Sequence, residues 1–212
     1  LQGETVLVTA GGTAEPIDAV RRITNRSSGK MGFALAQQAA RRGARVVLVA
    51  GLTDLATPEG VERLDVESAL EMREAVLEQL ASATLVIKAA AVADFRPEVP
   101  EAGKIKTEAL DSKQGITLRL VTNPDILAEV CSQKGDRLVV GFAAESENVV
   151  QNARRKLERK GCDLLVANDI SRADAGFDVD TNSVYLLDRK GEVEEVLSLI
   201  HISEPTRPER IG

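Results

Sequence analysis

The residues of this chain that could do chemistry most directly lie between Asn25 and Gly32, in the string Asn-Arg-Ser-Ser-Gly-Lys-Met-Gly. A helix whose first turn is Ser-Ser-Gly-Lys offers backbone N–H groups, two hydroxyls, an ammonium and the positive end of its dipole to an anion. Glycines at positions 29 and 32 would let a ligand approach the backbone closely. The string therefore predicts a site for an anionic, phosphorylated ligand.

Two known phosphate-binding patterns do not fit this string. A Walker loop, G-x-x-x-x-G-K-[ST], needs a glycine where Thr24 stands and a hydroxyl residue where Met31 stands. A dinucleotide fingerprint, G-x-G-x-x-G, follows the first strand directly, whereas here Pro16 interrupts any helix that could begin after Gly11 and Gly12. These mismatches argue against an ordinary P-loop NTPase and weaken the case for NAD or FAD.

Four further polar clusters follow expected strands or open expected helices, where open α/β sheets bind their ligands. They are residues 89–97, the alternate lysines of 104–106, the turn at 123–126, and residues 141–145 followed by a helix with two lysines. Each has a purely structural alternative. Asp94 can turn the chain, Lys104 and Lys106 can belong to a solvated loop, which the pattern alone favours, and Asn123 can cap a helix that starts at Pro124. Lys156 and Lys160 can be solvated on one helix face.

The hydrophobic pattern predicts the elements that position these clusters. Apolar runs suited to buried strands occur at residues 5–9, 45–50, 84–90, 138–143 and 163–167, and helical periodicity covers 32–42, 67–81, 124–133 and 147–160. A short strand is expected at 116–121, and a C-terminal β-hairpin at 183–188 and 193–199. The alternation predicts an α/β fold with a doubly wound, mainly parallel, Rossmann-like sheet flanked by helices.

Composition excludes several classes of function. With 43% hydrophobic but only 2% aromatic residues, the 212-residue chain can bury one core of Val, Leu, Ile and Ala. A net charge of −6 argues against binding to nucleic acid. No apolar run approaches the roughly 20 residues that span a membrane, and no signal peptide is visible, so a cytoplasmic protein is expected. Cys131 and Cys162 have no partners at metal-ligand spacing and are expected to be reduced, buried thiols.

The two ends of the chain differ from the rest. Residues 1–199 are expected to form a single domain, whereas residues 200–212 have no periodicity and resemble translated sequencing-adapter read-through. We therefore expect a non-native tail in which His201, the only histidine, has no function. Because the chain begins at Leu1 and soon enters a strand, it is expected to be a piece of a longer protein.

Taken together and in order, the strings at residues 9–13, 25–32, 89–97, 104–106, 123–126, 140–145 and 167–169 closely resemble the bacterial phosphopantothenoylcysteine synthetase family. The resemblance covers about residues 3–199. It implies that CTP activates 4′-phosphopantothenate to an acyl-cytidylate with release of pyrophosphate, and that the amine of cysteine then displaces CMP. It also implies Mg²⁺ accompanying CTP, a homodimer, and no flavin in this chain. The flavin would belong to an N-terminal decarboxylase domain of the full-length protein.

The resemblance also assigns roles to individual residues. Asn25 would stabilise the acyl intermediate for attack by cysteine, and Lys104 would neutralise charge that develops during nucleotidyl transfer. Substrate contacts would come from Asn25, Ala90, Ala91 and Asp94, and no residue is expected to ligate a metal directly. The expected nucleotide contacts are Gly11, Ser27, Gly29, Gly32, Ala89, Ala90, Asp94, Asn123, Pro124, Asp125, Ile126, Phe142, Lys156, Lys160 and Asn168. Lys88 departs from the pattern, because an apolar or small residue is expected at its strand position.

Two other functions remain open from the sequence. A short-chain NAD(P)-linked reductase would need a Tyr-x-x-x-Lys pair, but the only tyrosine, Tyr185, is followed four residues later by Arg189. A non-catalytic nucleotide-sensing module would bind CTP and form no product. Release of pyrophosphate from CTP, measured with and without cysteine, distinguishes the three functions.

Overall fold

The structure, a computed structural model, describes residues 1–106, 115–170 and 181–199. The chain divides into two compact units, residues 1–140 and 141–212. The expected tail at 200–212, with His201, lies outside the described residues. Within these residues no helix combines the length and apolar character needed to cross a membrane.

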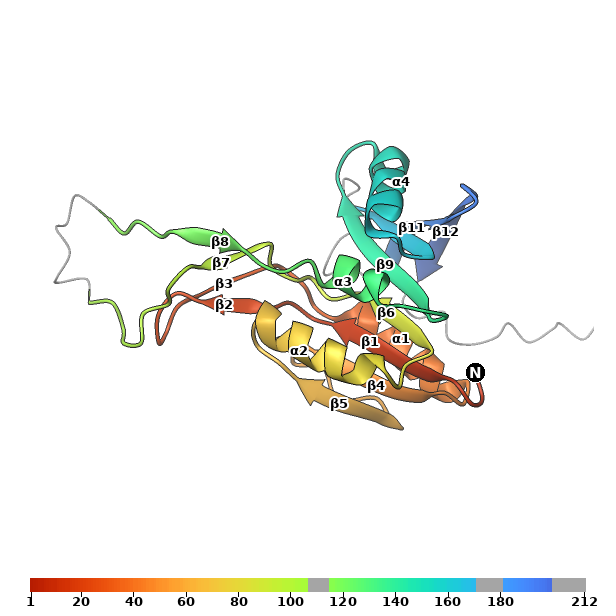
Figure 1. Cartoon of the computed structure of the whole chain (residues 1–212), viewed down its shortest axis with the longest axis horizontal. Helices are drawn as coiled ribbons and strands as arrows, with labels where there is room; N and C mark the ends of the chain where they lie inside the picture. Colours follow the sequence, from red (N-terminus) through yellow and green to blue (C-terminus); the bar gives the residue numbers. More distant parts are fainter. Residues whose placement is uncertain (107–114, 171–180, 200–212) are drawn as a thin grey trace, which may run out of the picture. The chain divides into compact units, whose positions relative to one another are not determined.

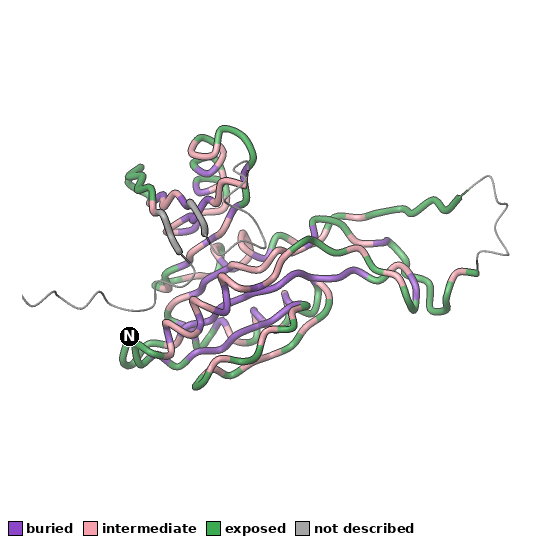
Figure 2. The backbone as a smooth tube through the Cα atoms, turned by 180° about the vertical axis from the view of Figure 1, so that it is seen from behind, coloured by how far each residue is buried: buried purple, intermediate pink, exposed green. Residues whose placement is uncertain are grey.

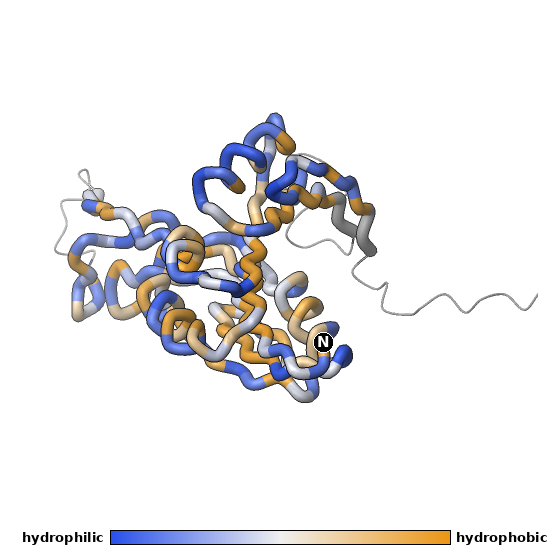
Figure 3. Tube along the Cα trace, turned by 45° about the vertical axis from the view of Figure 1, so that its right-hand side comes forward, coloured by the Kyte–Doolittle hydropathy of each residue, from blue (hydrophilic) through white to orange (hydrophobic). Residues whose placement is uncertain are grey.

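The first unit is built on four parallel strands in the order β6-β1-β4-β5. Their bounds are Thr5–Ala10 for β1, Arg45–Ala50 for β4, Val61–Asp65 for β5 and Leu85–Lys88 for β6. In the register, Thr9 of β1 lies opposite Val49 on one side and Lys88 on the other. Figure 2 shows β1 and β4 buried along almost their whole length, and Figure 3 shows hydrophobic stretches gathered along the strands of this unit.

Helices cover both faces of this parallel sheet. Helix α1 (Lys30–Arg41) leads from β1 toward β4, and α2 (Ala69–Leu80) leads from β5 back to β6, so right-handed crossovers place them on opposite faces. Figure 1 shows α2 in front of the strands and α1 behind them. Short helix α3 (Ile126–Ser132) contacts α2, and Arg73 Nε donates to Glu129 Oε2 at 2.6 Å between the two helices. The expected doubly wound α/β fold is confirmed.

Two short hairpins leave the sheet beyond the carboxyl ends of β1 and β6. One pairs β2 (Ala14–Pro16) with β3 (Arg22–Thr24), and the other pairs β7 (Phe95–Pro97) with β8 (Leu120–Thr122), both antiparallel. Strands β2 and β7 contact each other, and Figure 1 shows the hairpins extending side by side in one direction. Only the strand near β8 was expected, at residues 116–121, and it begins later than predicted.

The second unit contains the C-terminal strands. Strand β9 (Leu138–Glu145) starts in the first unit, where the Leu138 N–H donates to Thr84 O at 3.1 Å, and continues into the second. The order is then β9-β10-β11-β12, with β10 at Leu164–Asp169, β11 at Thr181–Asp188 and β12 at Val193–Leu199. Helix α4 (Val149–Lys160) packs on β10 and β11. The antiparallel pairing of β11 with β12 confirms the expected hairpin.

Candidate active site

The loops that follow β1 and β6 are tied to each other by hydrogen bonds. The Ala91 N–H donates to Gly11 O at 2.9 Å, and the Ala93 N–H donates to Thr13 Oγ1 at 2.9 Å. Both loops lie at the carboxyl edge of a parallel sheet, where neighbouring strands leave a crevice for ligands. The structure thus joins the glycine pair after β1 to the small-residue loop at 89–94.

Asn25 is held beside the same small-residue loop. Its exposed side chain donates from Nδ2 to Val92 O at 3.1 Å. Its backbone carbonyl lies against Gly12, where an added Cβ would be only 2.9 Å from the Asn25 oxygen. The preceding Thr24 hydroxyl donates to Thr13 O at 2.8 Å, which fixes the approach of the chain. Asn25, predicted as the residue that handles the acyl intermediate, therefore lies where three loops meet.

The loop that leads into α1 differs from its prediction. Ser27 and Ser28 precede the helix, which starts at Lys30 with Gly29 as its N-cap in the left-handed region, φ 78°. This backbone favours glycine, and the Thr53 hydroxyl holds the turn by donating to Ser28 O at 2.9 Å. The two serines are therefore part of a turn next to the helix, rather than its first turn.

Gly32 has a packing role that the sequence did not reveal. A Cβ at this position would lie 2.5 Å from Ala10 Cβ, so the missing side chain lets α1 pack directly on β1. Close helix–strand approach explains this glycine without a ligand. Its expected contact with the nucleotide stays a prediction.

Asn123 links the turn at 123–126 to the loop after β6. Its N–H donates to Asp94 O at 2.8 Å and its Nδ2 donates to Ala93 O at 2.8 Å, while its Oδ1 accepts from Arg96 Nη1 at 3.1 Å. The expectation that Asn123 caps a helix beginning at Pro124 is wrong. The helix starts at Ile126, and Asp125 caps it by accepting from the Ala128 N–H at 3.1 Å. The Asn123 side chain instead bonds Ala93 O and Arg96.

Lys88, the unexpected residue at the end of β6, is buried. The residue is only 6% exposed, and Nζ has no hydrogen-bond partner among the residues that the structure describes. Burial lowers the pKa of the Lys88 ammonium to about 7, and the nearby charge of Asp125 offsets this only in part. A buried lysine whose pKa lies near neutrality therefore comes directly before Ala89 and Ala90.

The segment that carries Lys104 contacts a different part of the chain from the loops around Asn25 and Asn123. Lys104 and Lys106 are both exposed, and the hydrogen bonds of the intervening Ile105 run to the turn between β2 and β3. Sequence reasoning did not include that turn, in which Asp18 is the buried acidic residue. Asp18 and Ile105 lie 87 positions apart in the sequence, so no local pattern indicates that they are in contact.

The second unit contains four of the predicted residues, Phe142 on β9, Lys156 and Lys160 on α4, and Asn168 on β10. Phe142 is half-buried on β9, and Lys156 of α4 forms an ion pair with Glu145, with Nζ 2.6 Å from Oε1. Glu145 also accepts from Asn152 Nδ2 at 3.2 Å. In β10, Asn168 Oδ1 is buried without a hydrogen-bond partner in the described part of the chain. Sequence reasoning missed Glu145 and Asn152, although Glu145 closes one of the quoted strings.

Metal binding by protein side chains alone finds no support in the described ranges. Within residues 1–106, 115–170 and 181–199, no group of three or more His, Cys, Asp or Glu side chains could hold a metal ion.

The fold defines a Rossmann-like α/β protein in which polar loops meet at the carboxyl edge of a parallel sheet, the edge at which such sheets bind their ligands. Residues 1–200 match the family described as DNA/pantothenate metabolism flavoprotein C-terminal domain, and the chain belongs to this family.

Similar proteins narrow this assignment. The coenzyme A biosynthesis bifunctional protein CoaBC of Vibrio cholerae is 48% identical over 193 residues, which is 91% of this chain and 48% of that protein. The chain thus spans about half the length of such relatives. A crystal structure of a CoaBC C-terminal domain aligns with TM-score 0.77 and 40% identity over 92% of this chain and 87% of the other. A Cab2 mutant in complex with phosphopantothenate-cysteine shares the fold, with TM-score 0.72 and 19% identity over 92% of this chain and 80% of the other.

Proposed function

We propose that this domain joins 4′-phosphopantothenate to L-cysteine at the expense of CTP, as a ligase of coenzyme A biosynthesis. Family membership and the CoaBC relatives support the pathway, and the phosphopantothenate-cysteine bound by the Cab2 mutant supports the substrates. The observation that carries the proposal is the arrangement of Asn25, the 89–94 loop and Asn123, which hydrogen bonds hold together at the carboxyl edge of the sheet.

The reaction would proceed in two displacements. A carboxylate oxygen of phosphopantothenate attacks the α-phosphorus of CTP, a new P–O bond forms, and pyrophosphate leaves. The cysteine amine then attacks the acyl carbon, a C–N bond forms, CMP leaves with the bonding electrons, and the amine loses a proton. Neither step needs a covalent bond to the protein, so catalysis rests on positioning and on stabilisation of developing charge.

Residues of the first unit would supply the chemistry. Asn25 is oriented by Val92 O, so its side-chain position is set before substrate binds. Its amide would stabilise the acyl intermediate, and the Lys104 ammonium would neutralise charge on the phosphates during the first displacement. Ala90 and Ala91 leave room beside the strand end, and Asp94 is exposed to a ligand there.

In the second unit, two observations support nucleotide binding. The buried Asn168 Oδ1 lacks a donor among the described residues and would accept a hydrogen bond from the nucleotide. Lys156 already faces a carboxylate in its ion pair with Glu145, so phosphate oxygens would compete with Glu145 for it. Lys160, one helical turn later, would add to the same grip.

Mg²⁺ would arrive with CTP and reduce the charge of the triphosphate. Flavin is assigned to a separate N-terminal decarboxylase domain of the longer protein, and the ligase would act in the cytoplasm. A homodimer is supported by apolar side chains exposed on and beside the β7–β8 hairpin, including Phe95, Val99 and Leu120. Burial of such side chains against a second copy would be favourable.

The decisive experiment follows pyrophosphate and product. The protein is incubated with CTP, Mg²⁺ and 4′-phosphopantothenate, with or without cysteine, and pyrophosphate and phosphopantothenoylcysteine are quantified. We expect activation without cysteine and amide formation with it, and less of both when ATP replaces CTP. Binding of CTP without pyrophosphate would instead support a sensing module, and NADPH oxidation would support a reductase.

A further inference from the structure

The short segment that carries Lys104 and Lys106 is held in place through the residue between them. The Ile105 N–H donates to Asp18 Oδ2 at 3.1 Å, and the Ile105 carbonyl accepts from Arg21 Nη1 at 3.3 Å. Three residues before Lys104, the Glu101 N–H donates to Ile17 O at 2.9 Å. The turn between β2 and β3 therefore forms three hydrogen bonds with the backbone of residues 101–105.

Asp18 is the residue of this turn whose side chain bonds both the turn itself and Ile105. Its side chain is buried, and it accepts from the N–H groups of Val20 at 2.8 Å and Arg21 at 2.7 Å as well as from Ile105. The Arg21 guanidinium forms an ion pair with it. Burial alone would raise the pKa of Asp18, but the hydrogen bonds from Val20, Ile105 and Arg21 outweigh it and lower the pKa to about 2. The carboxylate is thus ionised and has a single set orientation at neutral pH.

The bond to Ile105 goes beyond what the turn itself requires. The bonds to Val20 and Arg21 span two and three residues and already close the local turn, as an aspartate commonly does. The bond to Ile105 spans 87 residues and connects a different part of the chain. It fixes a backbone whose neighbouring side chains, Lys104 and Lys106, are exposed.

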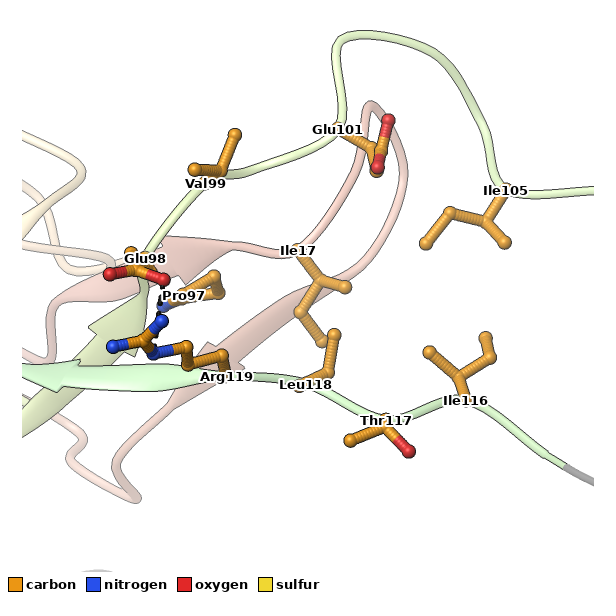
Figure 4. A pocket seen from close by; sticks show the side chains of 10 residues that line it. All are labelled: Ile17, Pro97, Glu98, Val99, Glu101, Ile105, Ile116, Thr117, Leu118 and Arg119. Atoms are coloured by element: carbon orange, nitrogen blue, oxygen red, sulfur yellow. Dashed lines mark ion pairs between the residues drawn. The ribbon is translucent and has the colours of Figure 1, made fainter.

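Apolar packing supports the same placement of Ile105. Its side chain lines a cavity of about 190 Å³ together with Ile17, Ile116 and Leu118, and with the charged residues Glu98, Glu101 and Arg119. Figure 4 shows these side chains around the cavity. The Ile105 side chain therefore occupies the apolar side of the segment, and the two lysines are left in solvent. Backbone hydrogen bonds and the position of the Ile105 side chain together determine the point from which the Lys104 and Lys106 side chains extend.

We propose that Asp18 is a positioning residue for the ligase reaction, which holds Ile105 so that the ammonium groups of Lys104 and Lys106 reach the phosphates of the nucleotide. The inference rests on the proposed function of this domain. A lysine side chain is long and flexible, so a displaced backbone moves the accessible region of its charge. Displacement of a catalytic group by about 1 Å can reduce a rate on the order of 100-fold.

The test uses Asp18→Asn, which keeps the shape of the side chain and removes its charge. We expect pyrophosphate release at saturating CTP and phosphopantothenate to fall by roughly 10- to 100-fold. The matched control is Asp188→Asn, because Asp188 also closes a hairpin turn, accepting from the N–H groups of Lys190 and Glu192 at 2.9 Å. That control should leave the rate unchanged. Equal rates for Asp18→Asn and the native chain would overturn the inference.

A combined variant separates positioning from general loss of structure. If Asp18 acts through Lys104 and Lys106, adding Asp18→Asn to a chain that carries both Lys104→Gln and Lys106→Gln should cause little further loss, whereas an independent structural role would multiply the losses. The multiplied result would refute positioning and leave the proposed function standing. Full activity of Lys104→Gln alone would instead show that Lys104 has no role in the reaction, and it would refute this inference as well.

A second variant covers the case in which Asp18→Asn does not fold. Ile105→Pro removes the N–H that Asp18 accepts, replaces the apolar side chain and restricts the backbone of Lys104, while the residues of the turn at 17–21 stay unchanged. We expect the same fall in pyrophosphate release with an unchanged melting temperature. Native release by a folded Ile105→Pro would contradict the proposal.

Discussion

Replacement of Lys88 by methionine should stabilise the fold, by an amount that depends on pH. The Lys88 ammonium is buried at the end of β6 with no hydrogen-bond partner among the described residues, and the nearby charge of Asp125 offsets its loss of hydration only in part. Methionine has a similar length and volume and suits an apolar site. The variant therefore removes the charge and keeps most of the packing.

The size of the effect follows from the pKa of Lys88 in the unfolded and the folded chain. Burial lowers this pKa from its ordinary value of 10.5 to about 7. At pH below 7 both states bind the proton, and the cost to folding is complete, about 5 kcal/mol at 1.36 kcal/mol per pKa unit. Between pH 7 and 10.5 the unfolded chain binds more protons, so native stability rises with pH and the cost disappears.

The measurement is urea unfolding followed by far-UV circular dichroism at pH 7, 8 and 9. The stability difference between Lys88→Met and the native chain should shrink by about 2 kcal/mol from pH 7 to pH 9. Contributions of packing do not depend on pH and cancel in this comparison. Lys190→Met, at an exposed lysine in the β11–β12 turn, is the matched control. A difference for Lys88→Met that stays constant across this range would refute the reasoning.

Three further predictions concern the site and its packing. Asn25→Asp should slow the cysteine-dependent step more than pyrophosphate release, because a carboxylate would repel the acyl-cytidylate; equal loss of both half-reactions in single-turnover assays would argue against this role. Gly32→Ala should destabilise the fold by about 1–3 kcal/mol in urea unfolding, since its Cβ would lie 2.5 Å from Ala10 Cβ. An unchanged midpoint would contradict that packing argument. Lys156→Met should raise the KM for CTP several-fold and leave the KM for cysteine unchanged, and a change confined to cysteine would exclude Lys156 from the nucleotide grip.

Periodicity predicted the interior strands well but missed β5, the edge strand of the first unit. The expected strand at residues 45–50 has the observed bounds of β4, because a strand covered on both faces is a continuous apolar run. Strand β5 was missed, since its residues Val61–Asp65 are half-buried or exposed at the edge of the sheet. Such a strand carries too few apolar residues to stand out from a loop.

Local rules were less accurate at the turn that begins α3. The preference of proline for the first helical position suggested Asn123 as the cap, but the cap is Asp125, two residues later. The difference has a tertiary cause, because Asn123 uses its side chain for Ala93 O and Arg96 instead. A local signal for capping could not show that a more distant partner would compete for the same amide.

The sequence by itself determined the fold class and the family of this protein, because alternating apolar periods and the order of seven short strings are properties of neighbouring residues. Only the tertiary structure decided which residues meet. It buried Lys88, packed Gly32 on Ala10, and brought Asp18 to the backbone of Ile105 across 87 positions. Contacts of this kind depend on how strand ends and hairpins are arranged in space, and the pattern of a short window contains no information about that arrangement.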